Sequence, residues 1–103
     1  MPPDPFTPKD RAAFRRRVDW VRDEFPADKP VRVMRTKRIC TADCEDKGTH
    51  YQIRIAQNPD VFTMSLHLLF HEMGHALEPN GEDHSPAFWH ALGMIYRADE
   101  IGE

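Results

Sequence analysis

One apolar stretch predicts the centre of the fold: Val61-Phe-Thr-Met-Ser-Leu-His-Leu-Leu-Phe-His-Glu-Met-Gly-His-Ala-Leu77. Its length and helical spacing predict a helix with two distinct faces. The apolar face comprises Leu66, Leu69, Phe70, Met73 and Leu77. A second face carries His67, His71 and His75. Asp60 or Thr63 can cap the start of this helix, and the turn Glu78-Pro79-Asn80-Gly81 ends it.

Helices are also expected near both ends of the chain. The first runs from about Lys9 to Phe25, with Thr7-Pro8 as its start and Pro26 as its end. Its apolar face comprises Phe14, Val18, Val21 and Phe25. The last begins at the cap Ser85-Pro86 and runs to about Ala98. Its inward stripe comprises Phe88, Leu92, Ile95 and Tyr96.

Two strands are expected between the first two helices, over Val31 to Ile39 and Thr49 to Gln57. The second alternates apolar and polar residues, as a half-buried strand does. Because Cys40 to Gly48 is polar and turn-like, we expect the two strands to form a hairpin with a long tip. The order helix, hairpin, helix, helix predicts a small α+β domain.

The composition is that of one globular domain, with 40 % hydrophobic and 30 % charged residues among 103. We expect an extended, loosely held, proline-rich arm over residues 1–8 and a single folded domain over residues 9–103. A net charge of −3 argues against general binding of polyanions. No apolar run reaches the ~18 residues of a membrane span, and the N-terminus lacks the features of a secretory signal. Two cysteines are too few for a disulfide scaffold, so a cytoplasmic protein is expected.

The chemistry is concentrated in His71-Glu72-Met73-Gly74-His75. A spacing of four residues puts both imidazoles on one side of a helix, one turn apart, where they can reach a single metal ion. Glu72 projects about 100° round the helix from His71, where its carboxylate can contact a water on that metal without being a ligand.

A catalytic zinc site needs a third protein ligand. The candidates are Glu78, Glu82, Asp83, His84, His90 and a cysteine. His84 is the best placed, because it follows a glycine-containing turn and immediately precedes the Ser85 cap, with Phe88 and Trp89 to anchor it. Glu78 would lie about two turns from His71 on a continuous helix. His67 is expected to be a neighbour of the site or a surface residue, and His50 and His90 to be structural or exposed.

These motifs resemble those of the SprT-like, WLM and related small zincin metallopeptidases. The resemblance lies in His71-Glu-Met-Gly-His-Ala-Leu-Glu and His84-Ser-Pro-Ala-Phe-Trp, and extends over roughly Thr49 to Tyr96. It implies a zincin-like domain with a mixed sheet beneath the active-site helix. It also implies that His71, His75 and His84 bind Zn2+ and that Glu72 is the general base. SprT-like proteins often carry a further zinc ribbon or nucleic-acid-binding extension, which these 103 residues do not include.

The predicted activity is hydrolysis of a polypeptide substrate. Zinc lowers the pKa of its bound water towards about 7, and Glu72 accepts the proton and passes it to the leaving amine. The sequence leaves four candidates for a donor to the developing oxyanion: Tyr51, Tyr96, His67 and Arg97. An exposed edge of the hairpin could bind the substrate as an added strand.

Two other functions share parts of this pattern. YbeY-like endoribonucleases use three histidines in a shorter pattern that ends in Asp-His, which Asp83-His84 echoes, but they lack the glutamate that Glu72 supplies. The second alternative is a non-catalytic interaction module that zinc only stabilises. The resemblance to DNA-associated SprT-like peptidases raises nucleic acid as a partner, and the charge of −3 weakens that reading.

Two further groups of residues need a separate interpretation. Cys40 and Cys44 are expected to be two reduced thiols, rather than a redox pair or a second metal site with His50. Arg11, Arg15 and Arg22 share one side of the first helix and could touch phosphates. Acidic residues lie in the same segment, so a solvated face of mixed charge is expected instead.

Overall fold

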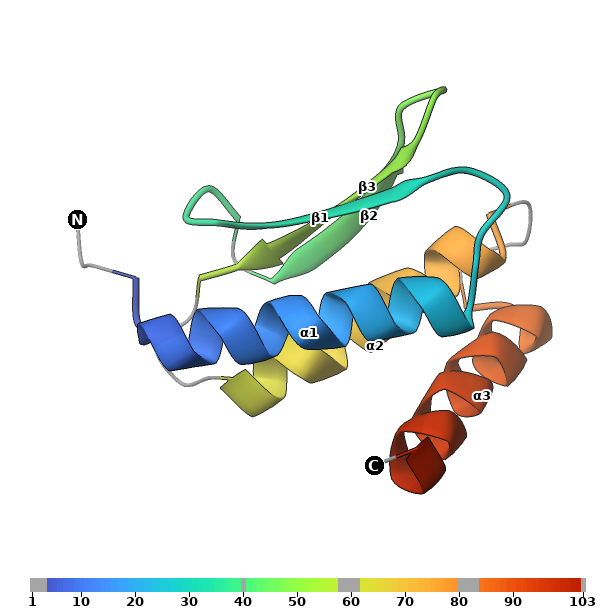
Figure 1. The fold of residues 1–103 in the computed structure, drawn as a ribbon. Coiled ribbons are helices and arrows are strands. Elements are labelled where there is room, and N and C mark those ends of the chain that lie inside the picture. The colour runs from blue at the N-terminus through green and yellow to red at the C-terminus, as the bar shows by residue number, and fades with distance from the viewer. Residues whose placement is uncertain (1–3, 40, 58–61, 80–83, 103) are drawn as a thin grey trace.

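Three helices and a three-stranded mixed sheet make up the α+β fold of the computed structural model, which describes residues 4–39, 41–57, 62–79 and 84–102. The elements are α1 (Pro8–Glu24), β1 (Val31–Thr36), β2 (Ala42–Asp46), β3 (Tyr51–Ala56), α2 (Phe62–Leu77) and α3 (Pro86–Gly102). Helices α1 and α2 lie along one side of the sheet, and α3 packs against α2 (Figure 1). Within the described residues, no helix has both the length and the apolar character needed to cross a bilayer.

The topology of the sheet differs from the expected hairpin. Strands β1 and β3 are neighbours but run parallel, with Val31 opposite Tyr51. The segment expected as a turn contains β2, which pairs antiparallel with the other side of β3 and gives the order β1-β3-β2. The expectation failed because β2 has no large apolar residue: its inward positions include only the small side chains of Ala42 and Cys44. The hairpin that does exist joins β2 to β3, through a turn in which Gly48 has φ +92°.

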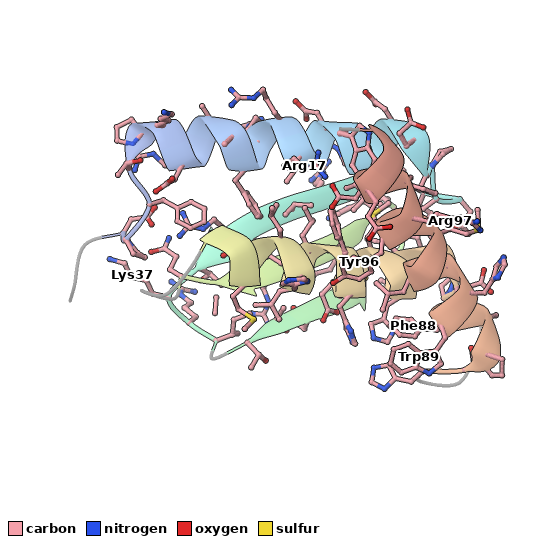
Figure 2. All side chains as sticks on the ribbon, turned by 90° about the horizontal axis from the view of Figure 1, so that it is seen from below. Arg17, Lys37, Phe88, Trp89, Tyr96 and Arg97 are labelled. Carbon is pink, nitrogen blue, oxygen red and sulfur yellow. The ribbon has the colours of Figure 1, made fainter. Side chains whose placement is uncertain are left out.

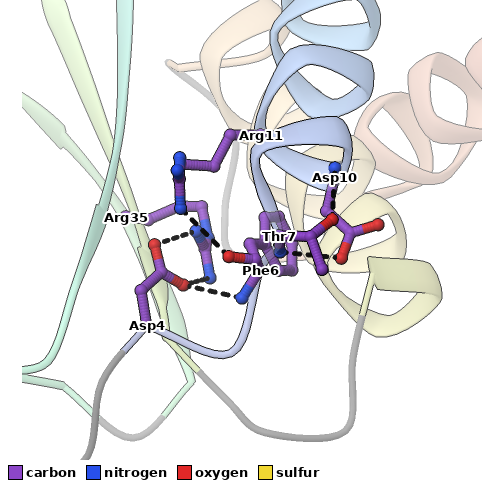
Figure 3. A network of polar contacts seen from close by, with 6 residues as sticks. All are labelled: Asp4, Phe6, Thr7, Asp10, Arg11 and Arg35. Atoms are coloured by element: carbon purple, nitrogen blue, oxygen red, sulfur yellow. Dashed lines mark hydrogen bonds and ion pairs between the residues drawn. The ribbon is translucent and has the colours of Figure 1, made fainter.

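Helix α1 begins where the sequence predicts. Thr7 accepts a hydrogen bond from the backbone N–H of Asp10, and the Asp10 carboxylate accepts one from the backbone N–H of Thr7 (Figure 3). This reciprocal capping satisfies donors that the helix itself cannot pair. Phe14 and Val18 are buried from this helix, as expected.

The arm that precedes α1 is not loosely held over its described residues. The Asp4 carboxylate accepts hydrogen bonds of 2.9 and 2.8 Å from the two terminal nitrogens of Arg35 on β1 (Figure 3). The Phe6 ring is only 4 % exposed and packs edge-on against Phe14. The prolines alone suggested an extended, loosely held arm. The contacts of Asp4 and Phe6 contradict that expectation. Residues 1–3 lie outside the described residues.

Helices α2 and α3 follow the predicted patterns closely. Leu69, Phe70 and Met73 are at most 2 % exposed in the core, where burial of each side chain stabilises the fold by about 1.5–3 kcal/mol. Thr63 lies inside α2 rather than at its cap, and Asp60, the other expected cap, lies outside the described residues. Helix α3 runs four residues beyond the expected end at Ala98. Its cap is as predicted, since the backbone N–H of Phe88 donates to Ser85 Oγ at 3.2 Å.

Candidate metal centre

Two of the predicted ligands lie one turn apart on α2. His71 and His75 are both half-buried, and their ring centroids are 5.1 Å apart. The apolar face of the helix is held in the core by Leu69, Phe70 and Met73, so the histidine face is directed away from that packing. The helix thereby holds the two imidazoles at a fixed separation.

His84 joins these two rings from the connection between α2 and α3. Its Nε2 lies 3.0 Å from His71 Nε2, and its ring centroid lies 5.2 Å from that of His75. One ligand atom from each of the three histidines lies within 4.8 Å of the others. Two nitrogens on one tetrahedral zinc, bound at ~2.0–2.1 Å, lie about 3.3 Å apart, so this spacing suits a shared metal ion.

The backbone of His84 adopts an uncommon conformation. Its φ of +56° is the left-handed value that non-glycine residues adopt at a cost of about 1–2 kcal/mol. The next residue, Ser85, is the N-cap of α3, so the start of that helix fixes where His84 lies. Trp89 packs against the His84 ring with centroids 5.5 Å apart, as expected for an anchor.

The Phe88 ring contacts all three histidines. Its centroid lies 4.4 Å from that of His75, in a stacked arrangement, and 5.0 and 4.9 Å from those of His71 and His84. Phe88 comes from the first turn of α3 and is 1 % exposed (Figure 2). It therefore forms an apolar base on which the three imidazoles rest.

Gly74 allows Phe88 to approach α2 so closely. A Cβ at Gly74 would lie 2.9 Å from Phe88 Cε1, a distance that real Cβ atoms essentially never show. No role was expected for this glycine from the sequence. The sequence does show a small residue between two histidines of one helix. The position of Phe88 explains why that residue is glycine.

Glu72 is 7 % exposed and lines two cavities. One, of about 470 Å³, is also lined by Cys44, Tyr51, His75 and His84. The other, of about 390 Å³, is also lined by His67, His71 and Tyr96. Ala42 of β2 borders both cavities. Glu72 of α2 and Ala42 of β2 therefore line both cavities.

The other candidates for a third ligand are not grouped with His71 and His75 among the described residues. Glu78 lines the larger cavity, and His90 is exposed on α3 beside a different one. Burial, with a smaller contribution from the Glu72 charge, raises the pKa of the Cys44 thiol to about 12, so this free thiol stays protonated at neutral pH. Glu82, Asp83 and Cys40 lie outside the described residues.

Two of the four candidate oxyanion donors form a pair beside the site. His67 Nδ1 and the Tyr96 hydroxyl are 2.6 Å apart, and both residues line the smaller cavity with His71 and Glu72. Burial raises the pKa of Tyr96, so its phenol keeps its proton. The Tyr51 hydroxyl instead donates to Asp28 at 2.7 Å, which raises its pKa to about 12. Arg97 is exposed on α3 (Figure 2).

The donor set can hold a metal ion. Three imidazole nitrogens suit zinc, copper, iron and nickel, and a buried carboxylate beside them suits a role outside the ligand set. Comparison with protein-family models and with curated proteins finds no match to this chain.

Proposed function

We propose that the protein is a zinc-dependent metallopeptidase in which His71, His75 and His84 hold the metal and Glu72 is the general base. The observation that carries the proposal is the convergence of three imidazoles within 4.8 Å, next to a carboxylate that is 7 % exposed. Three neutral protein ligands beside a cavity are typical of a catalytic rather than a structural zinc site.

The protein's own residues would divide the reaction between them. A bound zinc ion supplies Lewis acidity, which lowers the pKa of a water towards about 7 and polarises the peptide carbonyl. Glu72 accepts the proton of the attacking water at its carboxylate and later delivers it to the nitrogen of the leaving amine. Its burial keeps bulk water from taking that proton.

Tyr96 is the favoured donor to the carbonyl oxygen as negative charge develops there. With His67 Nδ1 protonated, His67 donates to the Tyr96 oxygen at 2.6 Å and leaves the phenolic O–H for the substrate. Tyr51 is disfavoured because its hydroxyl is held by Asp28.

The substrate is proposed to bind along β2. This strand lies at the end of the order β1-β3-β2, and its residue Ala42 borders both cavities. An extended peptide can pair with such an edge by main-chain hydrogen bonds, which brings a scissile bond to Glu72 without demanding a particular sequence.

The two alternatives have weaker support. A YbeY-like nuclease site would give Glu72 no role, and the Asp83-His84 pair on which that reading depends lies partly outside the described residues. A zinc ion that only stabilised the fold would give no role to the two cavities that Glu72 lines.

A pair of glutamine variants tests the proposal. We expect Glu72→Gln to retain about one zinc per chain and to lower kcat/KM for peptide hydrolysis by about 10²–10⁴-fold, because only the proton acceptor is lost. Glu78→Gln, at the residue that directly follows α2 and also borders the larger cavity, is the control and should stay near wild type. Metal analysis and hydrolysis of an unstructured protein, with and without a chelator, measure both. Wild-type turnover by Glu72→Gln, or zinc-dependent cleavage of RNA and not of protein, would contradict the proposal.

A further inference from the structure

The two cavities that Glu72 lines differ in the charge of their other lining residues. The larger cavity is also lined by the carboxylates of Asp43, Asp46 and Glu78. Among the described residues, the smaller cavity, of about 390 Å³, is lined by no lysine, arginine or aspartate and by no glutamate besides Glu72. A substrate that enters both cavities therefore meets several carboxylates in the larger one and only that of Glu72 in the smaller one.

A leucine and an aromatic ring line the smaller cavity. Leu68 of α2 is half-buried and also packs against the core, so its position is fixed. Tyr96 comes from α3 (Figure 2), and its ring makes an edge-on contact with Phe70 while its hydroxyl lies 2.6 Å from His67 Nδ1. Ala42 of β2 contributes only a methyl group to the lining. The cavity thus has rigid, largely apolar walls and room for a side chain.

The apolar surface continues along α2 beyond this cavity. Met64 lies four residues before Leu68, one helical turn away on the same face, and is 51 % exposed. An apolar side chain bound against these two residues would remove their exposed surface from water, which is favourable. A lysine or arginine side chain would lose hydration there and would find only Glu72, which the proposed reaction needs as its proton acceptor.

We propose that the smaller cavity binds a large apolar side chain of the substrate, next to the scissile bond. This inference rests on the proposed function, because it names the class of peptide that the same site would cleave: an extended segment that carries leucine or a side chain like it. Main-chain pairing along β2 demands no particular sequence, so a preference must come from the cavities. Leu68 is then a specificity-determining residue that contacts the substrate and takes no part in proton transfer.

Short peptides of glycine and serine with a single central leucine, lysine or alanine are the probes. We expect the zinc-loaded protein to cleave the leucine peptide beside its leucine, with kcat/KM at least about tenfold above that for the other two. Leu68→Glu should reverse the preference for leucine over lysine, and Leu68→Met should preserve it. Met94→Glu is the matched control, because Met94 is 47 % exposed on α3 and lines neither cavity. The ratio of kcat/KM for two peptides on one variant does not depend on how much of that variant is folded.

Binding of the same peptides to zinc-loaded Glu72→Gln tests the cavity without turnover. We expect the leucine peptide, and not the lysine peptide, to shift the Leu68 methyl signals in the nuclear magnetic resonance spectrum. The signals missing from the spectrum of Leu68→Met assign these methyl groups.

The outcomes separate this proposal from the proposed function. Equal kcat/KM for the three peptides, or the same preference in Leu68→Glu as in Met94→Glu, would overturn the apolar cavity and leave the peptidase intact. Cleavage of no peptide, with Leu68 signals that only the leucine peptide shifts, would overturn the peptidase and support the cavity as a binding site. Cleavage of no peptide, with unchanged Leu68 signals, would overturn both.

Discussion

The metal centre and the polar cluster of Asp4, Arg11 and Arg35 arrange their polar side chains in opposite ways. In the polar cluster, Arg35 donates to the Asp4 carboxylate and Arg11 donates to the backbone carbonyl of Phe6, so these side chains are paired within the chain. At the metal centre, donors of one kind converge on a single point, and His84 adopts φ +56° to reach it. The ion pair of Asp4 with Arg35 holds the N-terminal segment on the sheet, whereas the three converging histidines form a site that can hold a cation. A high density of polar side chains therefore does not by itself identify a site, because the arrangement of donors and acceptors decides whether they pair with one another or face a ligand.

The largest effect is expected from removal of the convergent ligand. His84→Ala should weaken zinc binding by at least about 100-fold while leaving the helical content unchanged. Loss of a residue that only hydrogen-bonds to a metal ligand typically lowers metal affinity about 10–100-fold, and loss of a ligand itself should lower it more. Isothermal titration with zinc measures the change. His90→Ala, at a histidine exposed on α3, is the control and should bind zinc like the wild type. Equal loss in both variants would contradict the assignment of His84.

The contact of Phe88 with Gly74 gives the next largest expected effect, on the free energy of unfolding. Gly74→Ala should lower the free energy of unfolding by about 2 kcal/mol, since the new Cβ would lie 2.9 Å from Phe88 and the ring must move. Gly93→Ala on α3, where a Cβ meets nothing within 4 Å, should instead stabilise the protein by up to about 1 kcal/mol through helix propensity. Thermal and urea unfolding distinguish the two. A stabilising Gly74→Ala would show that Phe88 does not approach α2 so closely.

The smallest change in the free energy of unfolding is expected from Asp4→Asn, in the polar cluster of Asp4, Arg11 and Arg35. The hydrogen bonds from Arg35 hold the pKa of Asp4 below its usual 3.8, so the ion pair stabilises the fold above that pH and the stabilisation is lost as pH falls through the lowered pKa. The variant should be less stable than the wild type by about 1 kcal/mol at pH 7, a modest value because solvent screens the pair, and the difference should shrink as pH falls through the lowered pKa of Asp4.

Urea unfolding between pH 7 and acidic pH measures whether the free energies of unfolding of the wild type and Asp4→Asn converge as pH falls. Asp23→Asn, at an exposed position of α1 without an ion pair among the described residues, should match the wild type throughout. A difference between wild type and Asp4→Asn that did not shrink as pH was lowered would show that Asp4 acts through packing rather than charge.

The elements that could be predicted were those with a local signal. The Thr7-Pro8 and Ser85-Pro86 caps mark the starts of α1 and α3 because capping uses neighbouring residues only. Strand β2 was missed because Asp43, Glu45 and Asp46 carry no apolar alternation, and its position depends on pairing with β3. The parallel pairing of β1 with β3 was missed for the same reason, since strand pairing is decided by contacts distant in sequence.

Local patterns in the sequence were enough to predict the three helices, the α+β class and the spacing of His71 and His75, because helical periodicity involves residues three and four apart. The turn and the Ser85 cap that precede α3 also pointed to His84. The contacts of Phe88 with the three imidazoles, its close approach to Gly74 and the ion pair of Asp4 with Arg35 became evident in the tertiary structure. Those contacts join different elements, and packing between elements, not a local pattern, selects the partner.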